Sequence, residues 1–250
     1  MQEEETNNNQ FSKISVICAL YIGNRPVQVS NILHDKLYYF NKQLNYLKTY
    51  KNKIHKFYFV TTFQDGEHLI DYKDKLISHE DDIVKIIIKP NQGGSYTSWK
   101  EGLKHDSGDS DLVFLIEDDY VVDSETSINE IVKDFKSSPD LFYYCGLWRQ
   151  NHASISNGII NNKMYHESGL EFQTINSVER HILFENQLKF LEPFRAKNYL
   201  IKDFTKKYNS EFSDGVDKMV QYGIPDGLVI FNPLTKTSPI PKSKLFTAIP

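Results

Sequence analysis

The sequence predicts a single α/β domain with an open, mostly parallel, twisted sheet flanked by helices, followed by a more irregular second half. Short apolar runs rich in β-prone residues alternate with helical segments through the first half of the chain. This alternation is typical of right-handed crossovers between parallel strands. The 250 residues suffice for one substantial core, and the sequence has no internal repeat or flexible linker that would divide it.

Four strands are predicted in the first half, each followed by polar or turn-forming residues. Continuous apolar runs of this length indicate strands that are covered on both faces of a sheet. The predicted strands are Ile14–Leu20, Phe57–Thr62, Ile83–Lys89 and Leu112–Ile116.

Three helices are predicted between these strands. The longest has apolar residues at steps of three or four, which places them on one face of an amphipathic helix. These residues are Val29, Leu33, Leu37, Phe40, Leu44 and Leu47. Two shorter helices are expected over Glu67–Ser78 and Tyr96–His105. The predicted order is therefore β, α, β, α, β, α, β.

The second half opens with a helix that Asp123 or Ser124 can cap. Its apolar residues are Ile128, Ile131, Val132 and Phe135. A further strand is predicted over Leu141–Trp148. The segment that follows is rich in Asn, Ser and Gly, and it predicts loops or a hairpin around Ile159 and Met164-Tyr165.

Charge and hydropathy exclude several classes of partner. The chain has 29 basic and 33 acidic residues, a formal net charge of −4, without the basic excess that nucleic-acid binding exploits. Its longest apolar runs are far shorter than the roughly 20 residues that span a bilayer. We therefore expect neither nucleic acid as a partner nor a transmembrane segment, and the sequence does not indicate an oligomeric state.

The amino terminus and the cysteines predict the setting of the protein. Residues 1–12 are mostly polar and lack the basic and apolar regions of a signal peptide, so we expect a disordered tail before a domain over 13–250. Cys18 and Cys145 lie in apolar stretches, where cysteine behaves as a small buried hydrophobe. Buried thiols favour a reducing, cytoplasmic setting, and a disulfide between the two is the alternative.

Four loops follow the predicted strands and should converge at one end of the sheet. In open α/β sheets, ligands bind at the carboxyl ends of the strands. The loops are Tyr21–Arg25, Gln64–Glu67, Asn91–Ser95 and Glu117–Tyr120.

The strongest chemical signal is the run Glu117-Asp118-Asp119, directly after the apolar strand that ends at Ile116. Three adjacent carboxylates repel one another unless something neutralises their charge. A hard cation such as Mg²⁺ or Mn²⁺ prefers oxygen ligands and would also attract a diphosphate. The alternative is that the strand simply enters solvent and the acids form a hydrated turn.

From about Ile14 to Asp123 the chain resembles the glycosyltransferase A fold of nucleotide-diphospho-sugar transferases, in particular family 2-like glycosyltransferases. The resemblance lies in Ile14–Leu20, Asp65, Asn91-Gln92-Gly93-Gly94, Gly102-Leu103 and Phe114-Leu115-Ile116-Glu117-Asp118-Asp119. It implies a nucleotide-sugar-binding half over 13–123 and an acceptor-binding half over 124–250.

The resemblance also implies roles for residues in the first half. Asp119 would contact the metal directly, while Glu117 and Asp118 would act through water, ribose or the donor sugar. The nucleoside, commonly uridine, would be held by Tyr21, Arg25 and Asp65. Two departures leave the base open: many relatives have aspartates where this chain has Thr61-Thr62-Phe63-Gln64-Asp65, and an arginine where it has Trp99-Lys100.

Further donor contacts are expected in the loop after the third strand and in the helix that follows it. Asn91 is one expected contact, and Gly93 and Gly94 would let the backbone approach a ligand closely, although the two glycines can equally make an ordinary turn. Lys100 could reach a phosphate, or it could be a solvated lysine.

For an inverting reaction, relatives place a carboxylate base downstream, near the start of a helix. Asp214 and Asp217 fit that position, although a helix cap explains Asp214 equally well. The other acids considered are Glu179, Glu185 and Glu211. A histidine can complete the metal site, and among His152, His166 and His181 we select His166, although an ordinary surface or core histidine is the alternative.

Aromatic residues after the acidic run could stack on sugar rings, but most of them must belong to the core. They include Tyr143-Tyr144, Trp148, Tyr165 and Phe172.

Three functions follow. The first is a Mn²⁺- or Mg²⁺-dependent glycosyltransferase that moves a sugar from a nucleotide-diphosphate donor, expected to be a UDP-sugar, to a glycan or other hydroxyl acceptor. The second is a sugar nucleotidyltransferase, which is disfavoured because no Gly-rich loop bearing Arg or Lys follows the first strand. The third is a non-catalytic carbohydrate-binding module on the same fold.

Overall fold

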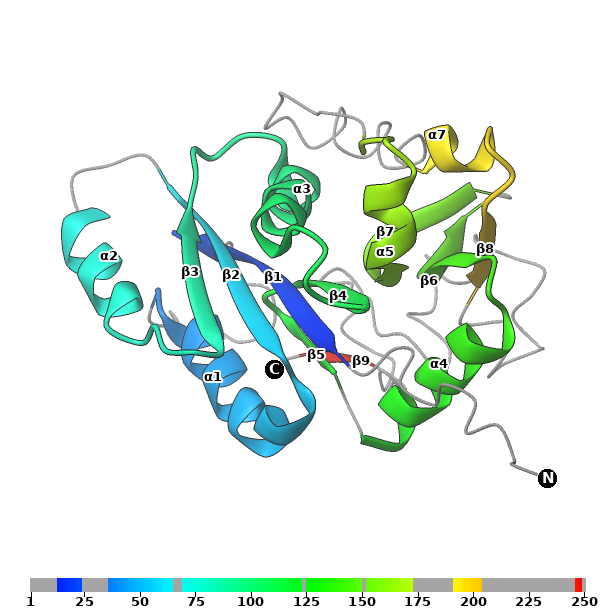
Figure 1. The fold of residues 1–250 in the computed structure, drawn as a ribbon. Helices are drawn as coiled ribbons and strands as arrows, with labels where there is room; N and C mark the ends of the chain where they lie inside the picture. Colours follow the sequence, from blue (N-terminus) through cyan, green and yellow to red (C-terminus); the bar gives the residue numbers. More distant parts are fainter. Residues whose placement is uncertain are drawn as a thin grey trace, which may run out of the picture.

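The computed structural model describes residues 13–23, 36–64, 69–122, 125–149, 152–172, 191–203 and 246–248. They form a seven-stranded sheet in the order β3-β2-β1-β4-β7-β6-β8 (Figure 1). The strands are β1 Ile14–Ile22, β2 Lys56–Phe63, β3 Val84–Ile88, β4 Leu112–Glu117, β6 Leu141–Arg149, β7 His152–Asn161 and β8 Leu200–Asp203.

Pairing within the sheet is mostly parallel, as predicted. β1 pairs in parallel with β2 and with β4, and β2 pairs in parallel with β3. β7 is antiparallel to both of its neighbours, β4 and β6, while β6 and β8 are parallel. The α/β fold class is therefore confirmed. A separate two-stranded antiparallel sheet joins β5, Tyr120–Val122, to β9, Phe246–Ala248.

Helices cover both faces of the large sheet (Figure 1). They are α1 Tyr38–Tyr50, η1 Lys51–Lys53, α2 Leu69–Ile77, α3 Gly94–Asp106, α4 Glu125–Ser137, α5 Asn162–Glu167 and α7 Glu192–Arg195. The described part of the longest predicted helix begins only at Tyr38, and Leu37 lies in the preceding turn. No described helix has both the length and the apolar content needed to cross a membrane.

The core is divided between the two faces because successive residues of a strand point to opposite sides of the sheet. In β4, Phe114 and Ile116 pack with the apolar residues of α1, α2 and α4. Val113 and Leu115 pack on the other face with those of α3, α5 and α7. Glu117 continues the alternation of Val113 and Leu115 and so comes to the α3 face.

The segment after β6 corrects one prediction. β6 and β7 do form an antiparallel hairpin that includes Ile159. Met164 and Tyr165, however, lie in helix α5 and not in a hairpin. The helix begins there because the side chain of Asn161 accepts a hydrogen bond from the backbone N–H of Met164 at 3.1 Å, which caps the first turn.

Several predictions concern residues outside the described ranges. They include the tail over 1–12, the helix positions Val29 and Leu33, and the side chain of Cys145. Cys18 is fully buried in β1, as predicted.

Candidate functional site

The carboxyl ends of four parallel strands meet at one end of the sheet, which we call the carboxyl edge. The register aligns Ala19 with Glu117, Leu20 with Thr61, and Thr61 with Ile88. The residues that follow these positions therefore lie at the same edge. The predicted convergence is confirmed for the described part of each loop: Tyr21–Gly23, Gln64, Asn91–Ser95 and Glu117–Tyr120.

We call Glu117, Asp118 and Asp119 the acidic turn, and α3 holds its first residue. Ser95, in the first turn of α3, donates a hydrogen bond from Oγ to Glu117 Oε1 at 2.6 Å. One turn further along, the indole N–H of Trp99 donates to the carbonyl of Ile116 at 2.9 Å. α3 thus fixes both the end of β4 and the carboxylate of Glu117.

Asp118 faces the interior and fastens the acidic turn to β1. It is only 3% exposed, and its Oδ2 accepts a hydrogen bond from the backbone N–H of Tyr21 at 2.8 Å. This contact orders the end of β1, where the ring of Tyr21 folds back over Gly23: a Cβ added at Gly23 would lie 2.6 Å from the Tyr21 hydroxyl. Glu117 and Asp119 are partly exposed.

A third support comes from α1, on the opposite face of the sheet from α3. The side-chain amide of Gln43 donates to the carbonyl of Asp118 at 2.9 Å and to that of Tyr120 at 2.5 Å. Gln43 is 1% exposed. Gln43 is not among the site residues predicted from the sequence, although it lies among the apolar positions Phe40, Leu44 and Leu47, where a polar residue is a signal.

The amino terminus of α3 lies beside the acidic turn. Its capping residue is Gly93, with φ 68°, and no side chain caps the helix. Gly94 also has a positive φ, 55°, which disfavours a side chain at either position. Backbone N–H groups at an uncapped helix terminus are ready donors for an anion.

The loop before α3, which contains Asn91, is shaped by Lys89, which is not among the site residues predicted from the sequence. Lys89 donates from Nζ to the carbonyls of Pro90 and Gln92, both at 2.9 Å. Burial lowers the pKa of Lys89. Asn91 itself is partly buried in this loop.

Lys100 forms an ion pair with another residue of the chain. Its Nζ lies 2.5 Å from Glu171 Oε2 and donates to the carbonyl of Phe172 at 3.2 Å. The hydrogen bond from Lys100, followed by its charge, lowers the pKa of Glu171. These contacts direct the ammonium group of Lys100 towards the residues that follow α5.

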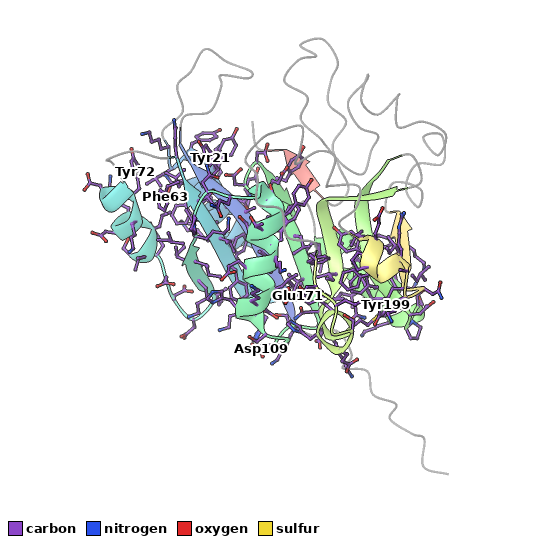
Figure 2. All side chains as sticks on the ribbon, turned by 90° about the horizontal axis from the view of Figure 1, so that it is seen from above. Tyr21, Phe63, Tyr72, Asp109, Glu171 and Tyr199 are labelled. Carbon is purple, nitrogen blue, oxygen red and sulfur yellow. The ribbon has the colours of Figure 1, made fainter. Side chains whose placement is uncertain are left out.

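His166 is not brought together with the acidic turn. Its ring packs against Gly108, where an added Cβ would lie 3.4 Å from His166 Cδ2. Gly108 precedes β4, whereas Asp119 follows it, and a six-residue strand spans roughly 17 Å. In Figure 2, Tyr21 and Asp109 likewise lie at opposite ends of the sheet. His166 is therefore left out of the candidate site.

The other predicted site residues lie outside the described ranges. They are Arg25, Asp65, the base candidates Asp214 and Asp217, the acids Glu179, Glu185 and Glu211, and His181. The side chains of His152 and Trp148 are likewise not described, whereas Tyr143, Tyr144, Tyr165 and Phe172 are buried in the core.

The donor set suits a hard cation that is shared with a phosphate. Among the described residues, no three or more His, Cys, Asp and Glu side chains are arranged to hold a metal ion. Mg²⁺ in phosphate-transfer sites generally uses one or two carboxylates together with substrate phosphates and water, and no all-protein cage. Glu117 and Asp119 are both partly exposed, and Glu117 is hydrogen-bonded to Ser95 at the uncapped amino terminus of α3, which fits that pattern.

No protein family matches the chain, and no curated protein matches it either. Among solved structures, it is similar to a cytidylyltransferase from Leptospira borgpetersenii, with 12% identity, TM-score 0.47, and coverage of 77% of this chain and 75% of that one. A 4-diphosphocytidyl-2C-methyl-D-erythritol synthase from Anaerococcus prevotii has 13% identity, TM-score 0.47, and coverage of 79% and 89%.

A third similar structure is a mannosyltransferase from Pyrobaculum calidifontis in complex with GDP-Man and Mn²⁺, with 10% identity and TM-score 0.46. The alignment covers 76% of this chain and 54% of that one. The similar structures thus include a nucleotidyltransferase and a sugar transferase. Because all three TM-scores lie below 0.5, the likeness carries no information about the reaction of this chain.

Proposed function

We propose that the carboxyl edge binds a divalent cation together with a nucleotide diphosphate, and that the chain is a metal-dependent glycosyltransferase. It would move a sugar from a nucleotide-diphosphate donor, first among them a UDP-sugar, to a glycan or other hydroxyl acceptor. The single observation that carries the proposal is the juxtaposition of a fixed acidic turn and an uncapped helix terminus, joined by the 2.6 Å hydrogen bond from Ser95 to Glu117.

Each part of the edge has a role in binding the donor. The first backbone N–H groups of α3 donate to the diphosphate, and the partial positive charge of the helix terminus favours its negative charge. Asp119 and Glu117 hold the cation, Mn²⁺ or Mg²⁺. When bound, that cation supplies Lewis-acid stabilisation of the charge on the leaving diphosphate.

The remaining roles rest on the sequence. Tyr21, Arg25 and Asp65 would hold the nucleoside at the ends of β1 and β2. Asp214 or Asp217 would take the proton of the acceptor hydroxyl, from the side of the sugar opposite the diphosphate, in an inverting reaction.

A sugar nucleotidyltransferase is the second candidate, because a cation site beside a helix terminus serves a nucleoside triphosphate as well as a sugar diphosphate. The two reactions give different products from matched substrates. A glycosyltransferase releases nucleoside diphosphate from a nucleotide sugar, whereas a nucleotidyltransferase releases pyrophosphate from a triphosphate and a sugar phosphate. Sugar binding that needs neither nucleotide nor metal would favour the non-catalytic module.

Calorimetry with UDP, GDP and CDP, each with and without Mn²⁺, tests the proposal directly. At least one nucleotide should bind only with Mn²⁺, and Asp119→Ala should weaken that binding about 100-fold or more, because the lost ligand is worth several kcal/mol. Asp82→Ala is the matched control, since Asp82 is an exposed acid before β3, at the opposite edge. Equal affinity in Asp119→Ala would remove Asp119 from the metal site, and wild-type protein that binds no nucleotide would overturn the proposal.

A further inference from the structure

Gln43 is a buried polar side chain in an otherwise apolar stripe of α1. Its neighbours on that face, Phe40 and Leu47, are buried in the core on the α1 side of the sheet. Burying an amide is costly unless its hydrogen-bonding groups find partners. Gln43 meets this requirement with two carbonyls of the acidic turn and its continuation, which lie 75 and 77 residues further along the chain.

The two carbonyls flank Asp119. The carbonyl of Asp118 belongs to the peptide group before Asp119, and the carbonyl of Tyr120 follows it. One amide group therefore fixes the backbone on both sides of the residue that is nominated to contact the metal. The partner groups are both acceptors, so only a donor at position 43 can satisfy them.

The two hydrogen bonds of Gln43 complete a set of three supports for the acidic turn, and the three supports come from different elements. Ser95 of α3 orients the Glu117 carboxylate, the Tyr21 N–H of β1 holds the Asp118 carboxylate, and Gln43 of α1 holds the backbone around Asp119. None of these supports requires a cation to be present. The acidic turn is thus arranged in advance, which reduces the cost of ordering it when a ligand binds.

We propose that Gln43 is the positioning residue of the metal site: it touches neither cation nor nucleotide, but it sets the affinity of Asp119 for the cation by fixing the turn. This inference rests on the proposed function of the carboxyl edge. Groups that orient metal ligands from behind typically change metal affinity 10- to 100-fold when they are lost.

The test compares two variants of the same helix. Gln43→Met keeps the length of the side chain and removes its donors. Leu47→Ala disturbs the packing of α1, since Leu47 is buried. The leucine side chain, however, makes no hydrogen bond to the acidic turn, because it has no donor or acceptor. Mn²⁺ affinity in the presence of saturating nucleotide is measured by electron paramagnetic resonance of the free ion, and thermal unfolding monitors the fold.

Gln43→Met should bind Mn²⁺ at least about tenfold more weakly, whereas Leu47→Ala should bind it as wild type does despite a lower melting temperature. Hydrogen exchange of residues 116–122, without any ligand, should be faster in Gln43→Met than in Leu47→Ala. Gln43→Asn keeps the amide but shortens the side chain, so it should lie between Gln43→Met and wild type, and it replaces Gln43→Met if that variant does not fold.

Two failures are distinguishable. If wild-type protein binds Mn²⁺ and nucleotide and Gln43→Met or Gln43→Asn binds them equally well, this inference is overturned and the proposed function stands. If wild-type protein binds neither, the proposed function falls, and the role of Gln43 in it falls too.

Discussion

The two ends of the parallel sheet both gather carboxylates, but they hold them differently. At the amino edge, where the strands begin, Asp109 pairs with His55 at 2.7 Å and with Lys13 at 2.9 Å. Nearby, Asp106 is 2% exposed and accepts hydrogen bonds from Ser110 Oγ and Asn162 Nδ2, both at 2.6 Å. At the carboxyl edge, the contacts described for Glu117 and Asp118 come from a hydroxyl and a backbone N–H.

We assign a structural role to the carboxylates of the amino edge and a ligand-binding role to those of the carboxyl edge. The Asp106 network joins the end of α3 to the starts of β4 and α5, and burial together with this carboxylate raises the pKa of Tyr58 on β2. Lys13 offsets the charge of Asp109 at the amino edge, whereas the hydroxyl and the backbone N–H described for Glu117 and Asp118 leave the carboxylate charge in place. Substitutions at the amino edge should therefore change stability, and substitutions at the carboxyl edge should change ligand binding.

The largest effect on this comparison is expected from Asp106→Ala. The substitution leaves Ser110 and Asn162 with buried donors that lack an acceptor, and we expect a loss of about 3–5 kcal/mol in the free energy of unfolding. Urea denaturation should show a lower midpoint with an unchanged slope. Nucleotide affinity of the protein that remains folded should not change; a loss of affinity without a loss of stability would contradict the division between the two edges.

Ser95→Ala should have a smaller effect, and this effect should be on ligand affinity and not on stability. Loss of the hydrogen bond to Glu117 costs about 1 kcal/mol, or roughly fivefold in Mn²⁺-dependent nucleotide affinity by calorimetry. Ser95 is partly exposed in the first turn of α3, so the midpoint of unfolding should move little. Ser98→Ala is a suitable control, since Ser98 lies one turn further along the same helix and donates to the carbonyl of Gly94.

The smallest effect concerns pH. The hydrogen bond from His55, followed by that from Lys13, lowers the pKa of Asp109 from 3.8 to about 2. A lowered pKa stabilises the fold above the unfolded value, and this contribution is lost as pH falls from about 4 to about 2. Because Asp109 is half exposed, the contribution should be under about 1 kcal/mol. Asp109→Asn should flatten the stability profile in that window, and a profile identical to wild type would show that the pair contributes nothing.

Much of the first half could be predicted because its signals are local. The runs that became β1 and β4 are apolar on both faces, and this property alone indicates a covered strand. Parallel order then brings their carboxyl ends together, so the edge that contains Glu117 followed from the alternation of elements. The predicted start of one helix was wrong by two residues, since α3 begins at Gly94 and not at Tyr96.

The remaining features depend on contacts between distant residues. Lys100 could reach a phosphate or a carboxylate, and only the fold brings Glu171 within 2.5 Å of it. His166 follows the acidic turn in sequence, yet the antiparallel course of β7 returns the chain to the start of β4 before α5 begins. The sequence shows Gln43 as a polar residue on an apolar face of the helix, but it does not show which groups the side chain contacts.

The contact between Gly102 and Ile17 affects the position of the amino terminus of α3, where Ser95 lies. A Cβ added at Gly102 would lie 2.5 Å from Ile17 Cγ2, so the helix sits on β1 at a depth that only a missing side chain allows. Because a helix moves largely as a rigid rod, a lift at this point would travel the seven residues, about 10 Å, to Ser95. The distance between the amino terminus of α3 and Glu117 therefore depends on the missing Cβ of Gly102.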